Sequence, residues 1–208
     1  MTAEIEIEGH RLVAVCPDDL NAPAQSMLAK FAELHARGPA LHPGSVIDFG
    51  WAPLRIEAMG EVWFVCEPDF AHDGQTFVPR VAVTLRVLDE QARVIELVRA
   101  KPCATRYDET VRIDKRGWDS PRVMVTRLPT KTPKDSGWYI MPDETEASPH
   151  PDEQSMTAGK LATSRPAWTK VFALPAKYLA IFEGDRLLEV YDEESRQVGS
   201  FQDGGDDV

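Results

Sequence analysis

The sequence is poor in cysteine and has no stretch that could cross a membrane. Its 208 residues include three cysteines, Cys16, Cys66 and Cys103, without a Cys-x-x-Cys pair, which argues against a disulfide framework and a zinc ribbon. We therefore predict buried, unreactive thiols. No apolar run approaches the ~18 residues that a membrane span requires. Residues 1–8 are acidic, where a signal peptide is basic and then apolar, so we predict a cytoplasmic protein without a membrane anchor.

Positive charge is also scarce. Lys and Arg number 23 against 34 Asp and Glu, so the formal net charge at pH 7 is −11. A chain of this charge repels a polyanion, which disfavours sequence-independent binding to nucleic acid. Residues 135–153 hold six acids and no Lys or Arg, and residues 183–208 hold nine acids against two arginines. These segments suit contact with one basic surface, and the alternative is an ordinary solvated surface.

Motifs of catalysis and cofactor binding are missing too. The sequence contains no dinucleotide-binding glycine pattern, no phosphate-binding loop, no His-Glu-x-x-His and no Gly-x-Ser-x-Gly. The five histidines fall in predicted turns and at helix ends, and no third ligand can be placed beside His35 and His42. We therefore predict a protein that is not an enzyme, with no catalytic residue, no metal site and no cofactor.

The composition is nevertheless that of a chain that folds, with 43% hydrophobic and 27% charged residues. Apolar residues recur at helical spacing between Asn21 and Gly38 and over 81–100, which predicts two amphipathic helices. Short apolar runs bounded by glycine and proline predict strands over most of the remaining sequence. The predicted fold class is α+β, with mostly antiparallel sheets and two amphipathic helices.

Hairpins are predicted at both ends of the chain. Residues 4–8 alternate between acidic and apolar side chains, and residues 12–16 continue as an apolar run after a turn. Near the other end, residues 178–182 and 187–191 flank a turn that contains Gly184. Each pair is typical of two antiparallel strands.

The composition changes after Lys101, which indicates a domain boundary. We predict an N-terminal α+β domain over 1–105 and a second α+β domain over 106–208, with the alternative that both pack as one unit. The polar, proline-broken stretch that ends near Thr157 is predicted to be a surface loop. Residues 202–208 are predicted to be a frayed tail.

Five tryptophans are many for this length. Trp63 lies in an apolar run and is predicted to be core, whereas Trp118 and Trp138 lie in polar segments that contain glycine. An indole in such a segment either packs under a loop or contacts a partner, because aromatic side chains are frequent in both cores and interfaces.

A family resemblance is carried by three consecutive pieces of sequence, Asp135-Ser136-Gly137-Trp138, Tyr139-Ile140 and Pro142-Asp143-Glu144. They resemble a family of bacterial immunity proteins from polymorphic toxin systems, in which a D-S-G-W segment precedes an acidic loop, a proline-containing helical stretch and a closing hairpin. The same order occurs here across residues 118–191. The resemblance implies a protein that binds a cognate toxin or secreted effector and blocks it by stoichiometric occlusion. The first hundred residues would then be the extension of a longer, two-part member.

The predicted binding patch combines this motif with the acidic loop. We expect the loop to lie beside an anchor indole and to contact a partner that is itself basic, through Asp135, Trp138, Asp143, Glu144 and Glu146, with Trp118 as a further aromatic contact. The alternative is that Asp135 only caps a turn and that Trp138 is buried.

Two other functions are compatible with the sequence. One is a generic partner-binding or scaffold module that has no toxin. The other is an unrecognised hydrolase or transferase, which would need a pocket that joins His72 or a cysteine to acidic groups. The sequence does not determine the oligomeric state, although paired edge strands could form a dimer.

Overall fold

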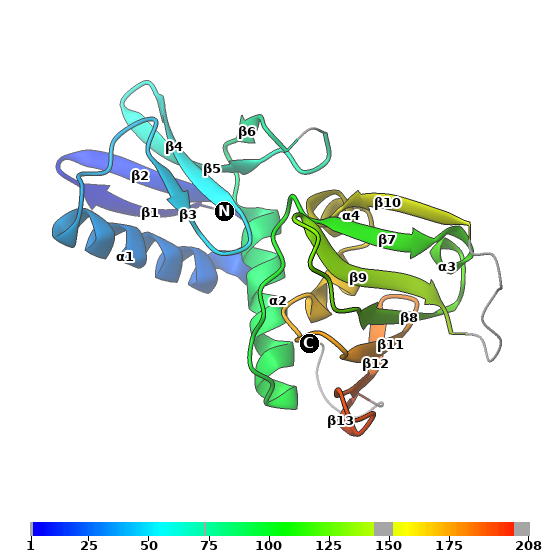
Figure 1. The fold of residues 1–208 in the computed structure, drawn as a ribbon. Helices are drawn as coiled ribbons and strands as arrows, with labels where there is room; N and C mark the ends of the chain where they lie inside the picture. The colour runs from blue at the N-terminus through cyan, green and yellow to red at the C-terminus, as the bar shows by residue number, and fades with distance from the viewer. Residues whose placement is uncertain (1, 73, 144–151, 202–208) are drawn as a thin grey trace. The chain divides into compact units, whose positions relative to one another are not determined.

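The structure is a computed structural model that describes residues 2–72, 74–143 and 152–201. The chain divides into two compact units, Met1–Asp89 and Glu90–Val208, and each is described by itself (Figure 1). Two mixed sheets with few helices confirm the predicted α+β class. The domain boundary at residue 105 stays a prediction.

The first unit is built on a six-stranded sheet with the order β1-β2-β5-β4-β3, and β6 pairs with β5. The strands are β1 (Thr2–Ile7), β2 (His10–Val15), β3 (Val46–Asp48), β4 (Pro53–Met59), β5 (Val62–Pro68) and β6 (Phe77–Val78). β1 and β2 form the predicted N-terminal hairpin. Every pairing is antiparallel except that of β2 with β5, which is parallel.

The core of this unit lies between one amphipathic helix and the sheet. The short helix η1 (Asp18–Leu20) leads into α1 (Asn21–Arg37), which is the first predicted helix. The buried side of α1 joins the alternate, inward-facing residues of the sheet in one hydrophobic core, which includes Met27, Leu28, Phe31, Leu12, Leu54, Ile56 and Val65. The spacing of apolar residues therefore predicted the helix and most of its buried side, although Leu34, the last apolar residue of that spacing, is exposed.

The second predicted helix, α2 (Ala82–Val98), contains the boundary between the two units. Its first turn is capped by a side chain from β5. The fully buried carboxylate of Glu67 accepts hydrogen bonds from the backbone N–H groups of Val83 (3.2 Å) and Thr84 (2.8 Å), which satisfies two helix donors. Burial raises the pKa of the Glu67 carboxyl to about 7, although these hydrogen bonds act in the opposite direction.

The second unit is built on a seven-stranded sheet with the order β10-β7-β9-β8-β11-β12-β13. The strands are β7 (Thr110–Asp114), β8 (Arg122–Arg127), β9 (Asp135–Pro142), β10 (Glu153–Thr157), β11 (Leu179–Glu183), β12 (Arg186–Tyr191) and β13 (Gln197–Ser200). β7 and β9 are parallel, and all other neighbours are antiparallel. β11 and β12 form the predicted C-terminal hairpin.

Short helices cover one face of this sheet, which we call the inner face. They are α3 (Lys115–Trp118), α4 (Ala158–Ser164) and η2 (Pro166–Val171). The indole of Trp168 in η2 donates to the carbonyl of Gly184 at the hairpin turn (3.4 Å), and Gln91 in the second half of α2 donates to the carbonyl of Thr169 (3.0 Å). The core of the second unit lies between these helices and the sheet.

Two sequence-based expectations about this unit need correction. The stretch predicted as a surface loop up to Thr157 ends in strand β10, because its last five residues pair with β7. Its polar alternation is that of an edge strand, which the proline-rich flank concealed. The strand β13 was not expected either. The predicted tail at 202–208 lies outside the described residues.

The cysteines differ from the prediction at one position. Cys16 and Cys66 are buried, whereas Cys103 is exposed. Cys103 follows α2 in a connecting segment, whose exposed neighbours Lys101, Pro102 and Ala104 leave its thiol uncovered. No helix in the described ranges is long and apolar enough to cross a membrane.

Candidate functional site

The D-S-G-W segment forms the start of β9, at the centre of the second sheet. β9 pairs with β7 on one side and with β8 on the other. Thr110 is opposite Asp135 and Arg112 is opposite Tyr139, so two steps on β7 correspond to four steps on β9. The motif therefore occupies a bulge, where the paired strand departs from regular pleating.

Asp135 and Ser136 hold this bulge with their side chains. The Asp135 carboxylate accepts a hydrogen bond from the backbone N–H of Gly137 (2.9 Å), as in an Asx turn. The Ser136 hydroxyl donates to the carbonyl of Thr110 (2.6 Å) and accepts from the N–H of Trp138 (3.1 Å). Both side chains replace regular ladder bonds, which gives these two motif residues a structural role.

Gly137 lies in the left-handed region, with a φ of 79°. A Cβ at this position would overlap the carbonyl oxygen of Leu128 in the connection from β8. The backbone of Gly137 also accepts a hydrogen bond from the N–H of Leu128 (2.8 Å). The close approach of the two chain segments therefore requires glycine.

Trp138 is fully buried on the inner face, so it is not an exposed anchor. Its ring stacks on Phe172 with centroids 4.8 Å apart, and its indole N–H donates to the hydroxyl of Thr105 (3.0 Å). The guanidinium of Arg127 lies 5.6 Å from the ring centroid. The alternative that the sequence left open, a capping Asp135 and a buried Trp138, describes the geometry.

Arg127 is itself a buried cation that is bound by carbonyl groups. Its guanidinium donates to the carbonyls of Ser136 (3.1 Å), Cys103 (2.6 Å) and Leu174 (2.8 Å). These acceptors come from three different segments of the chain. Arg127 therefore ties the start of β9 to the segments before β7 and after η2.

Trp118 is half-buried and belongs to an aromatic cluster on the same side of the sheet. Its ring meets Trp168 edge-on, with centroids 5.7 Å apart. The guanidinium of Arg165 lies 5.3 Å from the Trp118 centroid and 5.2 Å from the Trp168 centroid, and it donates to the Trp118 carbonyl (2.9 Å). Most of the Trp118 surface is therefore used within the unit.

The acidic members of the predicted patch are not gathered beside Trp138. Asp135 begins β9 and Asp143 follows its end, so roughly 20 Å of strand separates them. Asp143 is exposed and pairs with Arg122 (3.0 Å). Glu144 and Glu146 lie outside the described residues. The role of these residues in partner binding stays a prediction.

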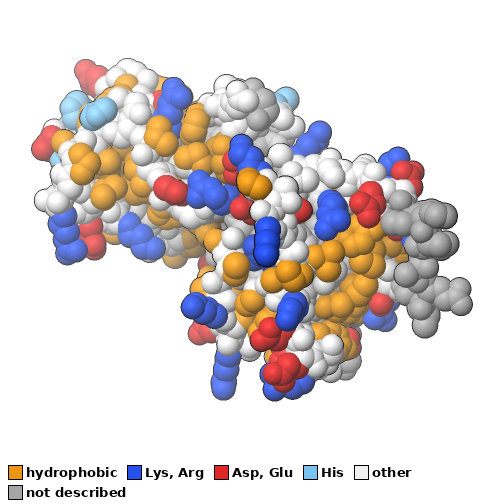
Figure 2. All heavy atoms as spheres, viewed as in Figure 1, with side chains coloured by type: hydrophobic (Ala, Val, Ile, Leu, Met, Phe, Trp, Pro, Cys, Tyr) orange, Lys and Arg blue, Asp and Glu red, His pale blue; other side chains and the backbone are white. Residues whose placement is uncertain are grey.

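Sequence reasoning missed the face of the sheet opposite Trp138, which we call the outer face. Its residues alternate with the buried ones along β8, β9, β11 and β12, and their register makes them neighbours. The apolar and aromatic members are Met124, Tyr139, Met141, Leu179, Ile181 and Tyr191, all half-buried except Ile181, which its neighbours bury. Figure 2 shows hydrophobic side chains gathered over β7, β9 and β8. Strands with apolar residues at nearly every position were the signal for this second face.

Polar groups on the outer face are engaged with its two tyrosines. The hydroxyl of Tyr191 donates to the carboxylate of Glu189 (2.7 Å), and this bond raises the pKa of the phenol. The guanidinium of Arg112 lies 5.6 Å from the centroid of the Tyr139 ring. Burial raises the pKa of Tyr139, and the charge of Glu153 acts in the same direction. Both phenols are therefore neutral hydrogen-bonding groups at pH 7.

The residues considered for catalysis are not brought together. The exposed ring of His72 lies 2.8 Å from the Asp69 carboxylate, while Cys16 and Cys66 are buried thiols. Burial raises the pKa of Cys66 to about 12, which opposes formation of a thiolate. Within the described ranges, no group of three or more His, Cys, Asp or Glu could hold a metal ion.

The second unit contains the part of the chain that resembles a known family. Residues 90–193, half of the chain, match the family model for the Imm33-like domain, which describes a class of immunity proteins. The chain therefore belongs to the Imm33-like family. The match runs from the second half of α2 through β12. No curated protein and no solved structure matches the chain.

Proposed function

We propose that this protein binds a cognate toxin or secreted effector and neutralises it by stoichiometric occlusion. The observation that carries the proposal is the Imm33-like match over residues 90–193. The matched residues include six of the seven strands of the second sheet, so the family resemblance covers a folded element and not a short motif. The predicted cytoplasmic location fits this role and stays a prediction.

The charge of the chain supports a basic partner. The formal net charge is −11, and the described residues 183–200 contain six carboxylates against two arginines. Toxin domains that attack nucleic acid carry positive charge where they bind the phosphate backbone. An acidic inhibitor would accelerate association with such a domain through electrostatic steering.

Co-expression with candidate toxins, taken from genes found beside the gene for this protein, tests this proposal. We expect the protein to restore growth of cells that make the toxin, and to co-purify with it as a complex of fixed stoichiometry. A toxin of another family is the control and should be neither bound nor neutralised. Binding of a partner without protection from any toxin would instead favour the scaffold alternative, and failure to bind or protect would contradict the proposal.

A further inference from the structure

We propose that the outer face of the second sheet is the surface that occludes the toxin, and that the toxin presents apolar side chains surrounded by Lys and Arg. This inference rests on the proposed function. Its core is the set of six residues already assigned to the outer face. Its margin is acidic and is formed by β12, β13 and the turns beside them.

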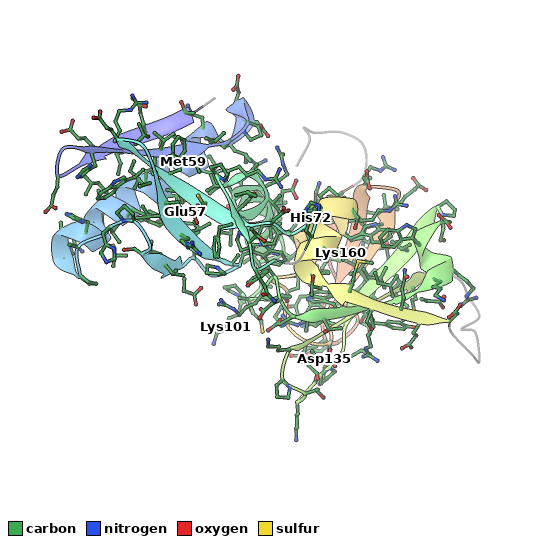
Figure 3. The ribbon with its side chains drawn as sticks, turned by 90° about the horizontal axis from the view of Figure 1, so that it is seen from above. Glu57, Met59, His72, Lys101, Asp135 and Lys160 are labelled. Atoms are coloured by element: carbon green, nitrogen blue, oxygen red, sulfur yellow. The ribbon has the colours of Figure 1, made fainter. Side chains whose placement is uncertain are left out.

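The outer face carries more apolar side chains than is usual for a sheet face that lies in solvent. A sheet with one side in solvent normally alternates between apolar and polar residues. The side of the first sheet away from α1 carries the ion pairs Arg11–Glu4 (3.2 Å) and Arg55–Glu57 (2.9 Å) beside its apolar residues. Figure 3 labels Glu57 and Met59 on β4 of that unit. In the second unit, methionine, tyrosine, leucine and isoleucine form the centre of the outer face, where Thr126 and Glu189 are their polar neighbours.

The registers make these side chains one continuous surface. Met124 is opposite Met141 across β8 and β9, and it is opposite Ile181 across β8 and β11. Leu179 is opposite Tyr191 across β11 and β12. Residues in such cross-strand pairs lie within contact distance. α4, η2 and the second half of α2 lie on the inner face, so within the described part of the second unit these helices leave the outer face uncovered.

The residue types suit a protein partner. Tyrosine is enriched at the centre of protein interfaces, because it offers a large apolar area together with a hydroxyl group. Methionine is flexible and polarisable, so it adapts to the shape of a partner. The two tyrosines of the outer face are held by neighbouring charged groups, which lowers the conformational entropy that they lose on binding.

The charge of the margin favours a basic toxin domain over a second copy of the chain as the partner of this surface. Two ion pairs of the margin, Arg186–Glu183 and Arg196–Asp192, are internally neutral, and Arg196 also pairs with Glu194 (2.9 Å). The carboxylate of Glu189 accepts a hydrogen bond from the neutral hydroxyl of Tyr191, a contact that leaves its negative charge uncompensated. A second copy of the chain in a two-fold contact would place this acidic margin close to itself, which is unfavourable. A basic toxin domain would neutralise the margin.

Methionine oxidation tests the surface in the unmodified chain. Hydrogen peroxide converts accessible methionine to its sulfoxide, and mass spectrometry reports the rate at each position. We expect a toxin domain identified in the co-expression experiment to slow oxidation of Met124 and Met141 at least about tenfold in the complex. Met59, which is 44% exposed on the first unit, is the control and should react at an unchanged rate.

Charged substitutions test the energetic role of the same surface. We expect Met124→Glu and Met141→Glu each to weaken toxin binding by about 30-fold or more, the effect typical of a residue at the centre of an interface. Met59→Glu is the matched control and should bind like the wild type. Circular dichroism and urea unfolding establish which variants are folded, and the oxidation experiment decides the outcome where a variant does not fold.

Each outcome separates this inference from the proposed function. Wild-type binding with unchanged oxidation of Met124 and Met141 would overturn the docking surface and leave the immunity function standing. Self-association of the free chain that protects both methionines would also overturn it, because a second copy would then occupy the surface. If the wild type neither bound nor neutralised the toxin, both proposals would be wrong.

Discussion

Gly137 shows how one residue can determine a local fold. Its left-handed backbone disfavours any side chain, and its closeness to the Leu128 carbonyl excludes even a methyl group. The same residue separates Ser136, which holds β7, from Trp138, which enters the core. The geometry of the chain therefore gives the residues of the D-S-G-W motif a structural role.

We expect Gly137→Ala to lower the free energy of unfolding by about 3–5 kcal/mol, since the overlap adds to the backbone strain. Gly184→Ala is the matched control, because Gly184 also has a positive φ (58°) but no atom within 4 Å of the Cβ that alanine would add. This control should lose only about 1 kcal/mol. Urea unfolding measures both values, and equal losses would show that the Leu128 carbonyl moves away.

The three thiols should differ in reactivity, because two of them are buried and one is exposed. Under native conditions we expect one equivalent of a thiol reagent such as DTNB to react quickly, at Cys103, and three equivalents in denaturant. Burial raises the pKa of Cys16 and Cys66, so both should react only when the fold opens. Cys103→Ser should remove the fast phase, and a remaining fast equivalent would mean that another thiol is accessible.

At the scale of the element, α2 depends on a side chain that is distant in sequence. The cap comes from Glu67, which lies in β5 and is distant from the helix in the sequence. The unfolded chain releases its Glu67 proton near the ordinary pKa of 4.5, whereas the folded chain keeps it up to about pH 7. The folded state therefore holds more protons within this window, and its stability must fall as the pH rises.

We expect the Glu67 carboxyl to remove up to about 3 kcal/mol of the free energy of unfolding between pH 4.5 and pH 7. Glu67→Gln cannot ionise, so its stability relative to the wild type should improve across this range. Glu61→Gln, at an exposed turn residue, controls for the loss of a carboxylate. Urea unfolding at several pH values provides the comparison, and a constant difference between Glu67→Gln and the wild type would contradict the prediction.

The elements that could be predicted from sequence are those whose signals are local. Apolar spacing defined α1 and α2, and a turn containing Gly184 defined the β11–β12 hairpin. The parallel pairing of β7 with β9 could not be predicted in this way, because β8 lies between the two strands in the sequence and no turn joins them directly. The burial of Trp138 depends on Phe172 and Thr105, which are distant in sequence.

The candidate site was harder to predict for a related reason. Acidic residues near an aromatic residue suggested one patch, but Asp135 begins β9 and Asp143 follows its last residue, so the strand holds them apart. A strand presents successive residues to opposite faces, so Tyr139 and Met141 lie on the outer face while Trp138 and Ile140 lie on the inner face. Assigning the consecutive apolar residues of this segment to alternate faces of a strand would have identified the outer face.

At the scale of the whole molecule, the net charge of −11 predicts how binding responds to salt. Raising the ionic strength from about 0.05 M to about 0.5 M should slow association with a basic toxin at least about tenfold, because screening removes long-range attraction. The dissociation rate should change much less. Stopped-flow or surface-plasmon measurements give both rates, and an association rate that is independent of salt would exclude steering by charge.

The position of α2 has a consequence for how the protein can be divided. Nine of its seventeen residues belong to the second unit, together with the Gln91 side chain that bonds to η2. A fragment that began at Glu90 would start in the middle of a helix and without the Glu67 cap, and nine residues are too few to stay helical alone. The family-matched portion thus begins within a helix whose first half and cap belong to the first unit, so an intact α2 requires residues from both units.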